Sequence, residues 1–247
     1  MNIAVSAILC IGISYIIGSI NLSYFLSKMN GYDIREHGSK NAGASNVIII
    51  MGKKIGVFVA LVDIFKAFLA VLLSGFLFED LTYAKEFAAV AVILGHIFPW
   101  YMGFRGGKGF ASLGGAILAL DCRLFVILLI IVLFIALITD YICFAPMSAS
   151  VMFPVVYGLV NRSLVSGAIL LIPAVFIIYR HQENLRRIKA GEELRFSFLW
   201  NRKAEAERFG VVDDDGKSFP FELEHRKQEE VSAHVTNHPG TGKNQTL

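Results

Sequence analysis

Long apolar runs separated by short polar segments dominate this chain and limit what it can fold into. A stretch of about 20 apolar residues suits a helix that crosses a lipid bilayer. Only 17% of the 247 residues are charged, against about 25% in an average soluble domain. We therefore predict an all-α fold, a polytopic membrane helical bundle of about seven transmembrane helices. The apolar runs are residues 3–27, 55–78, 86–102, 110–120, 123–139, 141–160 and 163–179.

The two runs at 3–27 and 110–120 have unusual lengths. The first is too long for the apolar part of a signal peptide, and no Lys or Arg precedes it, so we interpret it as the first span. The run at 110–120 is too short to cross a bilayer by itself. It could be tilted, half-inserted or fused to the run at 123–139, which leaves a count of five to seven spans.

Lysine and arginine gather in alternate segments between the runs, which gives an expected orientation. The richer segments are 28–54, 103–109 and the stretch after residue 179. The other segments hold only three cations, Lys85, Arg123 and Arg162. Because cytoplasmic loops of membrane proteins carry the excess of Lys and Arg, we expect the three richer segments in the cytoplasm. The N-terminus would then lie outside and the C-terminus in the cytoplasm.

Composition divides the chain into an integral membrane domain, residues 1–197, and a polar cytoplasmic tail, residues 198–247, which we expect to be largely disordered. The net charge of +3 forms no basic stripe with interleaved aromatic residues, so nucleic acid is not an expected partner. The cysteines lie far apart without metal-ligand spacing, so we predict neither a disulfide nor a metal site. They are Cys10, Cys122 and Cys143.

The first polar cluster, "GSKNAGASNV" at 38–47, has the composition of an anion cradle. Its small residues let backbone N–H groups approach a ligand closely, and Lys40 adds a positive charge. Neutral hydrogen-bonding groups come from Ser39, Asn41, Ser45 and Asn46. The alternative interpretation is an ordinary polar loop made of turn residues.

The second cluster, "GHIFPWYMGFRGGKG" at 95–109, follows an apolar run. Its glycines free the backbone, and Lys108 adds a compact cation, as in a phosphate site. It is not a Walker A loop, because Met102 and Gly109 stand where that motif needs Gly and Ser or Thr. The alternative is a flexible cytoplasmic loop. His96 is a candidate base, and the alternative is a hydrogen-bonded structural residue.

The third cluster, "RHQENLRRIKAGEE" at 180–193, begins where the last apolar run ends. On a helix, His181 and Asn184 are three positions apart and share a face, and Arg180 lies four positions before Asn184. The alternative is a basic helix segment that only contacts the membrane surface.

Asp63 and Lys66 lie inside the second apolar run. Each ionised residue near the centre of a bilayer costs about 2.5–3.5 kcal/mol on the insertion scale, so the two are expected to pair across one helical turn. The pair could line the site and hold a ligand or a loop, or it could be a structural ion pair that faces the bundle.

The three clusters are expected on one face of the membrane, and together they predict a single pocket for a ligand rich in phosphate. At the lipid boundary, an acyl chain could enter such a pocket sideways. The three segments resemble, in order and spacing, the three cytoplasmic motifs of the bacterial acyl-phosphate:glycerol-3-phosphate acyltransferases of the PlsY type. "GSINLSY" at 18–24 and "DIFK" at 63–66 also resemble family positions, and the likeness covers about residues 5–195.

The resemblance implies transfer of an acyl group from acyl phosphate to the 1-hydroxyl of glycerol 3-phosphate, without a cofactor or metal, in the bacterial plasma membrane near its cytoplasmic face. Acyl phosphate is already activated, so positioning and charge neutralisation could suffice, with a substrate phosphate oxygen taking the hydroxyl proton. The resemblance implies catalytic roles for Ser39, Lys108, His181 and Asn184. It implies substrate binding by Lys40, Asn41, Gly43, Asn46, His96, Gly106, Gly107, Gly109 and Arg180.

Two positions depart from the family pattern. Ile49 stands where the first motif normally continues to an arginine, and Asn21 stands where the first span usually has proline. Lys53 or Lys54 could supply the missing charge, although lysine lacks the bidentate fork of arginine. Ile49 leaves open a diverged paralogue that binds lipid phosphate without turnover. Broken membrane segments with anion sites at helix ends would also fit a transporter of small phosphate esters.

Overall fold

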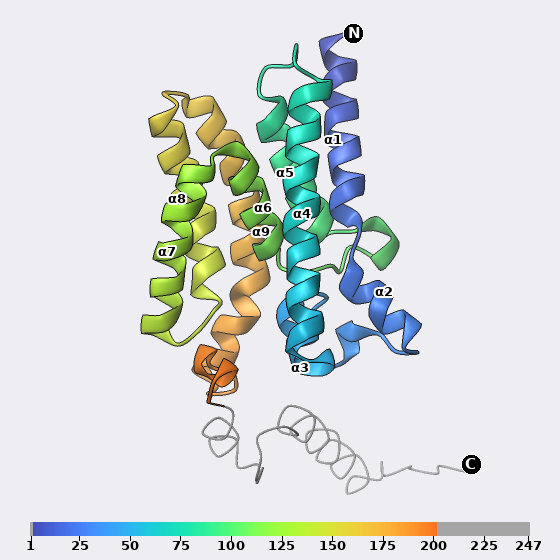
Figure 1. Cartoon of the computed structure of the whole chain (residues 1–247), viewed down its shortest axis with the longest axis vertical. Helices are drawn as coiled ribbons and strands as arrows, with labels where there is room; N and C mark the ends of the chain where they lie inside the picture. The colour runs from blue at the N-terminus through green and yellow to red at the C-terminus, as the bar shows by residue number, and fades with distance from the viewer. Residues whose placement is uncertain (1, 202–247) are drawn as a thin grey trace, which may run out of the picture.

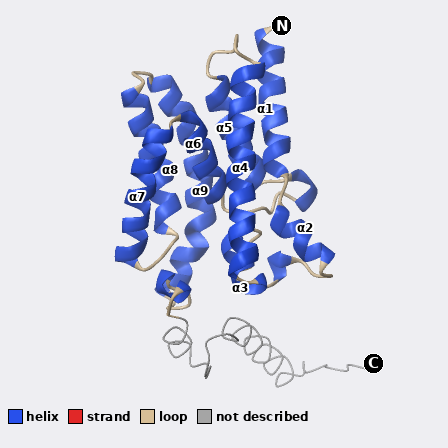
Figure 2. Cartoon of the chain, viewed as in Figure 1, coloured by secondary structure: helices blue, strands red, loops and turns tan. Residues whose placement is uncertain are grey.

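Residues 2–201 are described by a computed structural model, and within this part of the chain every regular element is a helix (Figures 1 and 2). The all-helical prediction is confirmed. The α-helices are α1 (Ile3–Ser19), α2 (Leu22–Met29), α3 (Ala44–Met51), α4 (Lys53–Leu77), α5 (Ala84–Ile97), α6 (Phe110–Leu120), α7 (Cys122–Thr139), α8 (Phe144–Val160) and α9 (Leu164–Lys189). Three short 3-10 helices are η1 (Ile34–Glu36), η2 (Trp100–Met102) and η3 (Phe196–Leu199). Nearly all of the predicted disordered tail lies outside the described residues.

Within residues 2–201, four helical stretches are long and apolar enough to cross a membrane, and they confirm a multi-pass membrane protein. They are Ile3–Met29, Lys53–Leu77, Cys122–Thr139 and Leu164–Lys189. Two shorter apolar helices, α6 and α8, pack among them, and α5 has 14 residues. The number of spans and their orientation stay predictions.

The run at 3–27 is not one continuous helix, and the run at 110–120 is not fused to its successor. Ile20 and Asn21 are extended and separate α1 from α2. Asp121 is also extended and caps α7, because its Oδ1 accepts hydrogen bonds from the N–H groups of Arg123 and Leu124. In both places a short polar side chain satisfies the N–H groups that a new helix leaves free.

Glycines let the helices of the bundle approach one another closely. A Cβ atom at Gly18 of α1 would overlap with the carbonyl of Val92 in α5, and one at Gly95 would overlap with the carbonyl of Tyr15. Such backbone approach is typical of helix packing in membranes, where van der Waals contact replaces the hydrophobic drive. In the bundle, helices α1, α4 and α5 form one side, and α7, α8 and α9 form the other (Figure 1).

The segment after α9 folds back across one end of the bundle. Asp140, at the end of α7, accepts hydrogen bonds from the Ser197 N–H at 2.7 Å and the Ser197 hydroxyl at 2.9 Å. Lys53 donates to the carbonyl of Leu199, and Phe198 is buried. Residues 190–200, which we call the clamp, are thus attached to α7 and to the start of α4, below α9 in Figure 1.

Candidate active site

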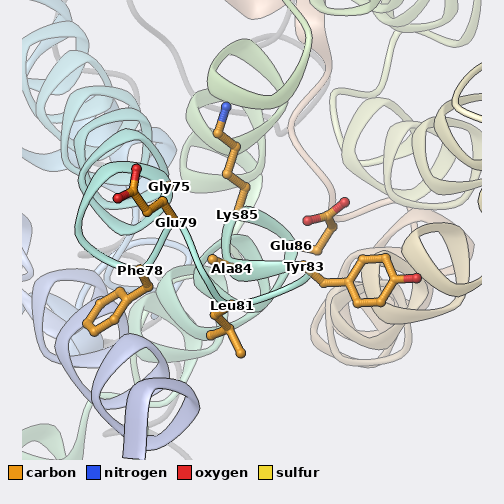
Figure 3. Close-up of a pocket in the computed structure, with 8 residues that line it drawn as sticks. All are labelled: Gly75, Phe78, Glu79, Leu81, Tyr83, Ala84, Lys85 and Glu86. Carbon is orange, nitrogen blue, oxygen red and sulfur yellow. The ribbon is translucent and has the colours of Figure 1, made fainter. Parts of the chain in front are cut away.

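A pocket of about 220 Å³ opens at the turn between α4 and α5 (Figure 3). Among its lining residues are Glu79, Lys85 and Glu86. Figure 1 shows this turn beside the N-terminus, at the other end of α4 from α3. None of the residues predicted to bind phosphate lines this pocket, so we place the candidate site away from this turn, at the three clusters.

The glycine loop, residues 103–109, folds back on the end of α5. The Gly106 N–H donates to the carbonyl of Ile97 at 3.0 Å, and the Gly107 N–H donates to the carbonyl of His96 at 3.1 Å. These bonds satisfy carbonyls that the end of a helix leaves without partners. Two amides predicted to bind phosphate are therefore engaged in shaping the loop, and an anion would meet the amides that follow them.

Close contact explains why the loop needs glycine at two successive positions. A Cβ atom at Gly107 would overlap with Nε2 of His96, and one at Gly106 would overlap with the His96 carbonyl. His96 thus lies directly under the loop that carries Lys108. Whether His96 also touches substrate stays a prediction.

The start of α6 supplies the amides that the glycine loop does not. Gly109 has a φ of +88°, which turns the chain into the helix. The first hydrogen bond of α6 runs from the Leu113 N–H to the Gly109 carbonyl, so the N–H groups of residues 110–112 have no helical acceptor. The hydroxyl of Ser112 is buried and also has no partner. A helix start with free N–H groups and a nearby lysine is a suitable anion site.

Lys108 projects from this loop toward α9, where its ammonium donates to the side-chain oxygen of Asn184. Asn184 in turn donates to Glu193 at 2.5 Å, and Arg187 donates to the other oxygen of Glu193 at 2.6 Å. Burial, and next the nearby guanidinium of Arg187, lower the pKa of Lys108 to about 8. Neighbouring anions favour the charged ammonium, so a phosphate bound here would do the same.

One face of α9 lies against the glycine loop. Ile177, His181 and Asn184 follow one another at helical spacing, and Ile177 lies under Gly109. His181 is buried, and its Nδ1 lies 2.7 Å from the Ile177 carbonyl. In the neutral ring, this contact assigns the proton to Nδ1 and leaves Nε2 as an acceptor.

Arg180 joins the last helix to the glycine loop from the side. Its Nη2 donates to the carbonyl of Gly106 at 3.0 Å, while its Nε is buried without a partner. Arg187 also has a buried nitrogen without a partner, its Nη2. Both guanidinium groups therefore retain donor capacity for an anion beside Lys108.

The first cluster is a tightly bonded loop ahead of α3. Asn46 is fully buried: its Oδ1 accepts from the Ser39 N–H at 2.7 Å, and its Nδ2 donates to the carbonyls of Ile34 and His37. Asn46 therefore shapes the loop, and its predicted contact with substrate remains untested. Gly43 is the N-cap of α3.

Three further groups of this loop remain candidates for a ligand. Lys40 is exposed and has a φ of +55°, a left-handed conformation that non-glycine residues rarely adopt. Asn41 is buried, and its Oδ1 has no partner. Ser39 is half-buried, and its N–H is the one held by Asn46.

Sequence reasoning missed Arg35, which lies in η1 just before the first cluster and joins that segment to the second cluster. Its Nη1 donates to the carbonyl of Met102 at 2.6 Å, while its other nitrogens hold both carboxylate oxygens of Asp33. The Arg35 guanidinium keeps the pKa of Asp33 well below its usual range. The only signal in the sequence was an Asp and an Arg two positions apart, which is common in polar loops.

Asp63 and Lys66 form the predicted pair, with Nζ of Lys66 2.7 Å from Oδ1 of Asp63. The same ammonium lies 3.1 Å from Nδ1 of His96. The pair thus faces the bundle and contacts the histidine under the glycine loop.

The fold is that of an integral membrane helical protein, and the three clusters form a candidate anion site among its helices. The family model for glycerol-3-phosphate acyltransferases matches residues 8–191, so the chain belongs to the glycerol-3-phosphate acyltransferase family. The resemblance inferred from the three motifs is confirmed.

Two curated relatives and one solved structure illustrate the similarity. Glycerol-3-phosphate acyltransferase 1 of Oceanobacillus iheyensis is 36% identical over 203 residues, which cover 78% of this chain and 96% of that protein. The glycerol-3-phosphate acyltransferase of Aquifex aeolicus is 34% identical over 186 residues, covering 74% and 95%. A crystal structure of PlsY (YgiH), an integral membrane glycerol 3-phosphate acyltransferase in its glycerol 3-phosphate form, matches with a TM-score of 0.72 and 32% identity, over 78% of this chain and 97% of that one.

Proposed function

We propose that this protein transfers an acyl group from acyl phosphate to the 1-hydroxyl of glycerol 3-phosphate. The observation that carries the proposal is the contact between Lys108 and Asn184 beside the free amides at the start of α6. Two anions must meet in the reaction, and this cluster offers a lysine, two arginines and backbone N–H groups in one place. Family membership supports the same reaction.

In the reaction, the hydroxyl oxygen of glycerol 3-phosphate attacks the acyl carbonyl carbon. The bond between that carbon and the phosphate oxygen breaks, and the products are lysophosphatidic acid and inorganic phosphate. Lys108 and the amides of residues 110–112 would neutralise charge on the leaving phosphate. The proton would pass to a phosphate oxygen of the substrate.

Nε2 of His181 would accept a hydrogen bond from the substrate hydroxyl and orient it for attack. Ser39 would contact the second substrate from the first cluster. The remaining binding roles assigned to Lys40, Asn41, Gly43, Asn46, His96, Gly106, Gly107, Gly109 and Arg180 are part of the same proposal. Buried side-chain atoms without a partner favour direct substrate binding by Asn41 and Arg180. Hydrogen bonds within the protein favour a role in shaping the loops for Asn46, Gly106 and Gly107.

The test is formation of lysophosphatidic acid by purified protein from palmitoyl phosphate and glycerol 3-phosphate. Lys108→Ala should abolish the product, whereas Lys85→Ala, which removes an exposed lysine at the far end of the bundle, should not. A well-folded wild-type protein that forms no product would overturn the proposed reaction for these substrates.

Ile49 favours a second candidate, a paralogue that binds lipid phosphate without turnover. Lys53 donates to Leu199 of the clamp, so it is not free to replace an arginine. If the wild-type protein binds lysophosphatidic acid but makes none, and Ile49→Arg restores turnover, the second candidate is correct. Phosphate-ester flux into sealed vesicles without product would indicate a transporter instead.

The location that we propose is the bacterial plasma membrane, with the site near the cytoplasmic face, the N-terminus outside and the C-terminus inside. The excess of Lys and Arg around the site supports this orientation. Single cysteines at the exposed positions of Lys54 and Lys85, in a Cys122→Ala background, should react with an impermeant thiol reagent from opposite sides of oriented vesicles. Labelling of position 54 from outside would reverse the orientation.

A further inference from the structure

The first apolar stretch breaks inside the protein, at a point that contacts the first cluster and the 3-10 turn η2, which precedes the glycine loop. Helix α1 ends at Ser19 and α2 begins at Leu22, with Ile20 and Asn21 extended between them. We call residues 19–21 the break. Interrupting a membrane helix frees backbone groups that must find partners within the protein. Those partners show what the break is attached to.

Asn21 connects the break to the first cluster. Its side chain is buried, and its Oδ1 caps α2 by accepting the Tyr24 N–H at 2.9 Å. Its Nδ2 donates to the carbonyl of Ala42 at 3.0 Å, in the middle of the "GSKNAGASNV" loop. One side chain therefore starts a helix and holds a loop 21 positions later.

Tyr101 connects the break to the segment that precedes the glycine loop. Its hydroxyl donates to the carbonyl of Ser19 at 2.8 Å and accepts from the N–H of Asn21 at 3.2 Å. The Tyr101 ring also stacks on Phe25 of α2, with centroids 5.7 Å apart. Tyr101 of η2 thus hydrogen-bonds to the break on both sides of Ile20, at Ser19 and at Asn21.

Lys66 makes the third connection, from α4. Its ammonium donates to the carbonyl of Ile20 at 2.5 Å, is paired with Asp63, and lies 3.1 Å from Nδ1 of His96. The opposite nitrogen of His96 lies under Gly107, where a side chain would not fit. A series of contacts therefore leads from the break through Lys66 and His96 to the loop that carries Lys108.

We infer that the break is the positioning element of the site, and that Asn21 and Lys66 are positioning residues that set the two phosphate-binding loops relative to each other. The inference rests on the proposed function, because it concerns the same two anionic substrates. Neither residue needs to touch a substrate. Asn21 acts through Ala42, and Lys66 acts through His96. A misplacement of about 1 Å between two reacting groups can cost on the order of 10²-fold in rate.

Two variants separate positioning from folding. Asn21→Ser keeps an oxygen that can cap α2 but removes the side-chain amide nitrogen that reaches the Ala42 carbonyl. The double variant Asp63→Asn/Lys66→Met removes the ion pair as a unit, which avoids leaving one buried charge alone. Ser14→Ala is the matched control, because Ser14 and Ser74 make a buried contact between α1 and α4 away from the break.

Each positioning variant should lower kcat/KM by about tenfold or more, with a raised KM for at least one of the two anionic substrates. The unfolding midpoint in detergent should stay within a few degrees of the Ser14→Ala control. Unchanged kinetic constants in both variants would overturn the inference. So would losses of activity that merely follow the loss of stability.

Amide hydrogen exchange tests the same inference without activity. In the variants, exchange should rise in residues 38–46 and 103–109, while α7 and α8 stay as in the wild-type protein. If the wild-type protein makes no lysophosphatidic acid yet these loops loosen, the proposed reaction fails and the positioning role stands. If exchange in the loops does not change, the positioning role fails by itself.

Discussion

The ammonium of Lys108 donates to the side-chain oxygen of Asn184, a residue 76 positions later in the chain. Asn184 cannot turn away, because its amide nitrogen is held by Glu193 at 2.5 Å. The lysine that follows two glycines in a loop is thus aimed by a helix at the other end of the sequence.

Asn184→Ala should lower kcat/KM on the order of 10²-fold, because Lys108 loses the acceptor that aims it at the developing charge. Asn184→Asp should be as damaging, since it places a second carboxylate against Glu193. Steady-state kinetics with both substrates measure the effect. Gln182→Ala, at an exposed position of the same helix, is the control. Wild-type kinetics in Asn184→Ala would contradict the role of this contact.

The pH profile should depend on Lys108. Because burial lowers the pKa of Lys108 to about 8, the free enzyme holds a charged ammonium below that pH and loses it above. We expect kcat/KM to fall above about pH 8, towards tenfold per pH unit. The substrate phosphate, with a second pKa of about 6, does not change in this range.

Lys108→Arg serves as the control for this profile, because guanidinium stays protonated throughout. Its activity should be lower, since the planar fork replaces a compact ammonium, but its profile should stay flat from pH 8 to about 9.5. A parallel decline in both proteins would assign the titration to another group.

Gly107→Ala should inactivate the protein without unfolding it. The new methyl group would overlap with the ring of His96, so the loop that carries Lys108 must shift. We expect a loss of kcat/KM of about 10²-fold, as for other small misplacements of reacting groups. Gly114→Ala in α6 is the control, since its Cβ would meet only Phe125 at 3.8 Å. Equal activity of the two variants would show that the loop tolerates the shift.

Asn46→Ala should act mainly on stability. It leaves a backbone N–H and two carbonyls without their buried partners, at a cost of about 2–4 kcal/mol. The unfolding midpoint in detergent should fall clearly, whereas Asn30→Ala, at an exposed position, should change stability by about 0.5 kcal/mol or less. A stable but inactive Asn46→Ala protein would instead support direct contact with substrate.

Helix existence was predictable because apolar length is a strong local signal. The runs that became α4, α7 and α9 differ from their helices mainly at the ends. The break at Ile20 was not predictable in the same way, because Ser19 and Asn21 are two isolated polar residues within a long apolar run. Its cause lies in partners from distant segments, above all Lys66 and Tyr101.

The candidate site shows the same division between local patterns, which can be recognised in the sequence, and contacts between distant segments, which cannot. Lys108, His181 and Asn184 could be named from motif spacing, since glycine and a cation in a loop, and two polar residues one helical turn apart, are local patterns. Arg35 could not be named, because its role comes from the carbonyl of Met102, 67 positions away. Sequence spacing also could not show that the amides of Gly106 and Gly107 are used by the end of α5.

The partners of the break also determine when the protein can finish folding during synthesis. The carbonyl of Ile20 is held by Lys66, and the carbonyl of Ser19 is held by Tyr101. Both partners lie later in the sequence than the first span, so they are synthesised after it. The N-terminal helix pair therefore acquires these hydrogen bonds only after α4 and the η2 turn have been synthesised.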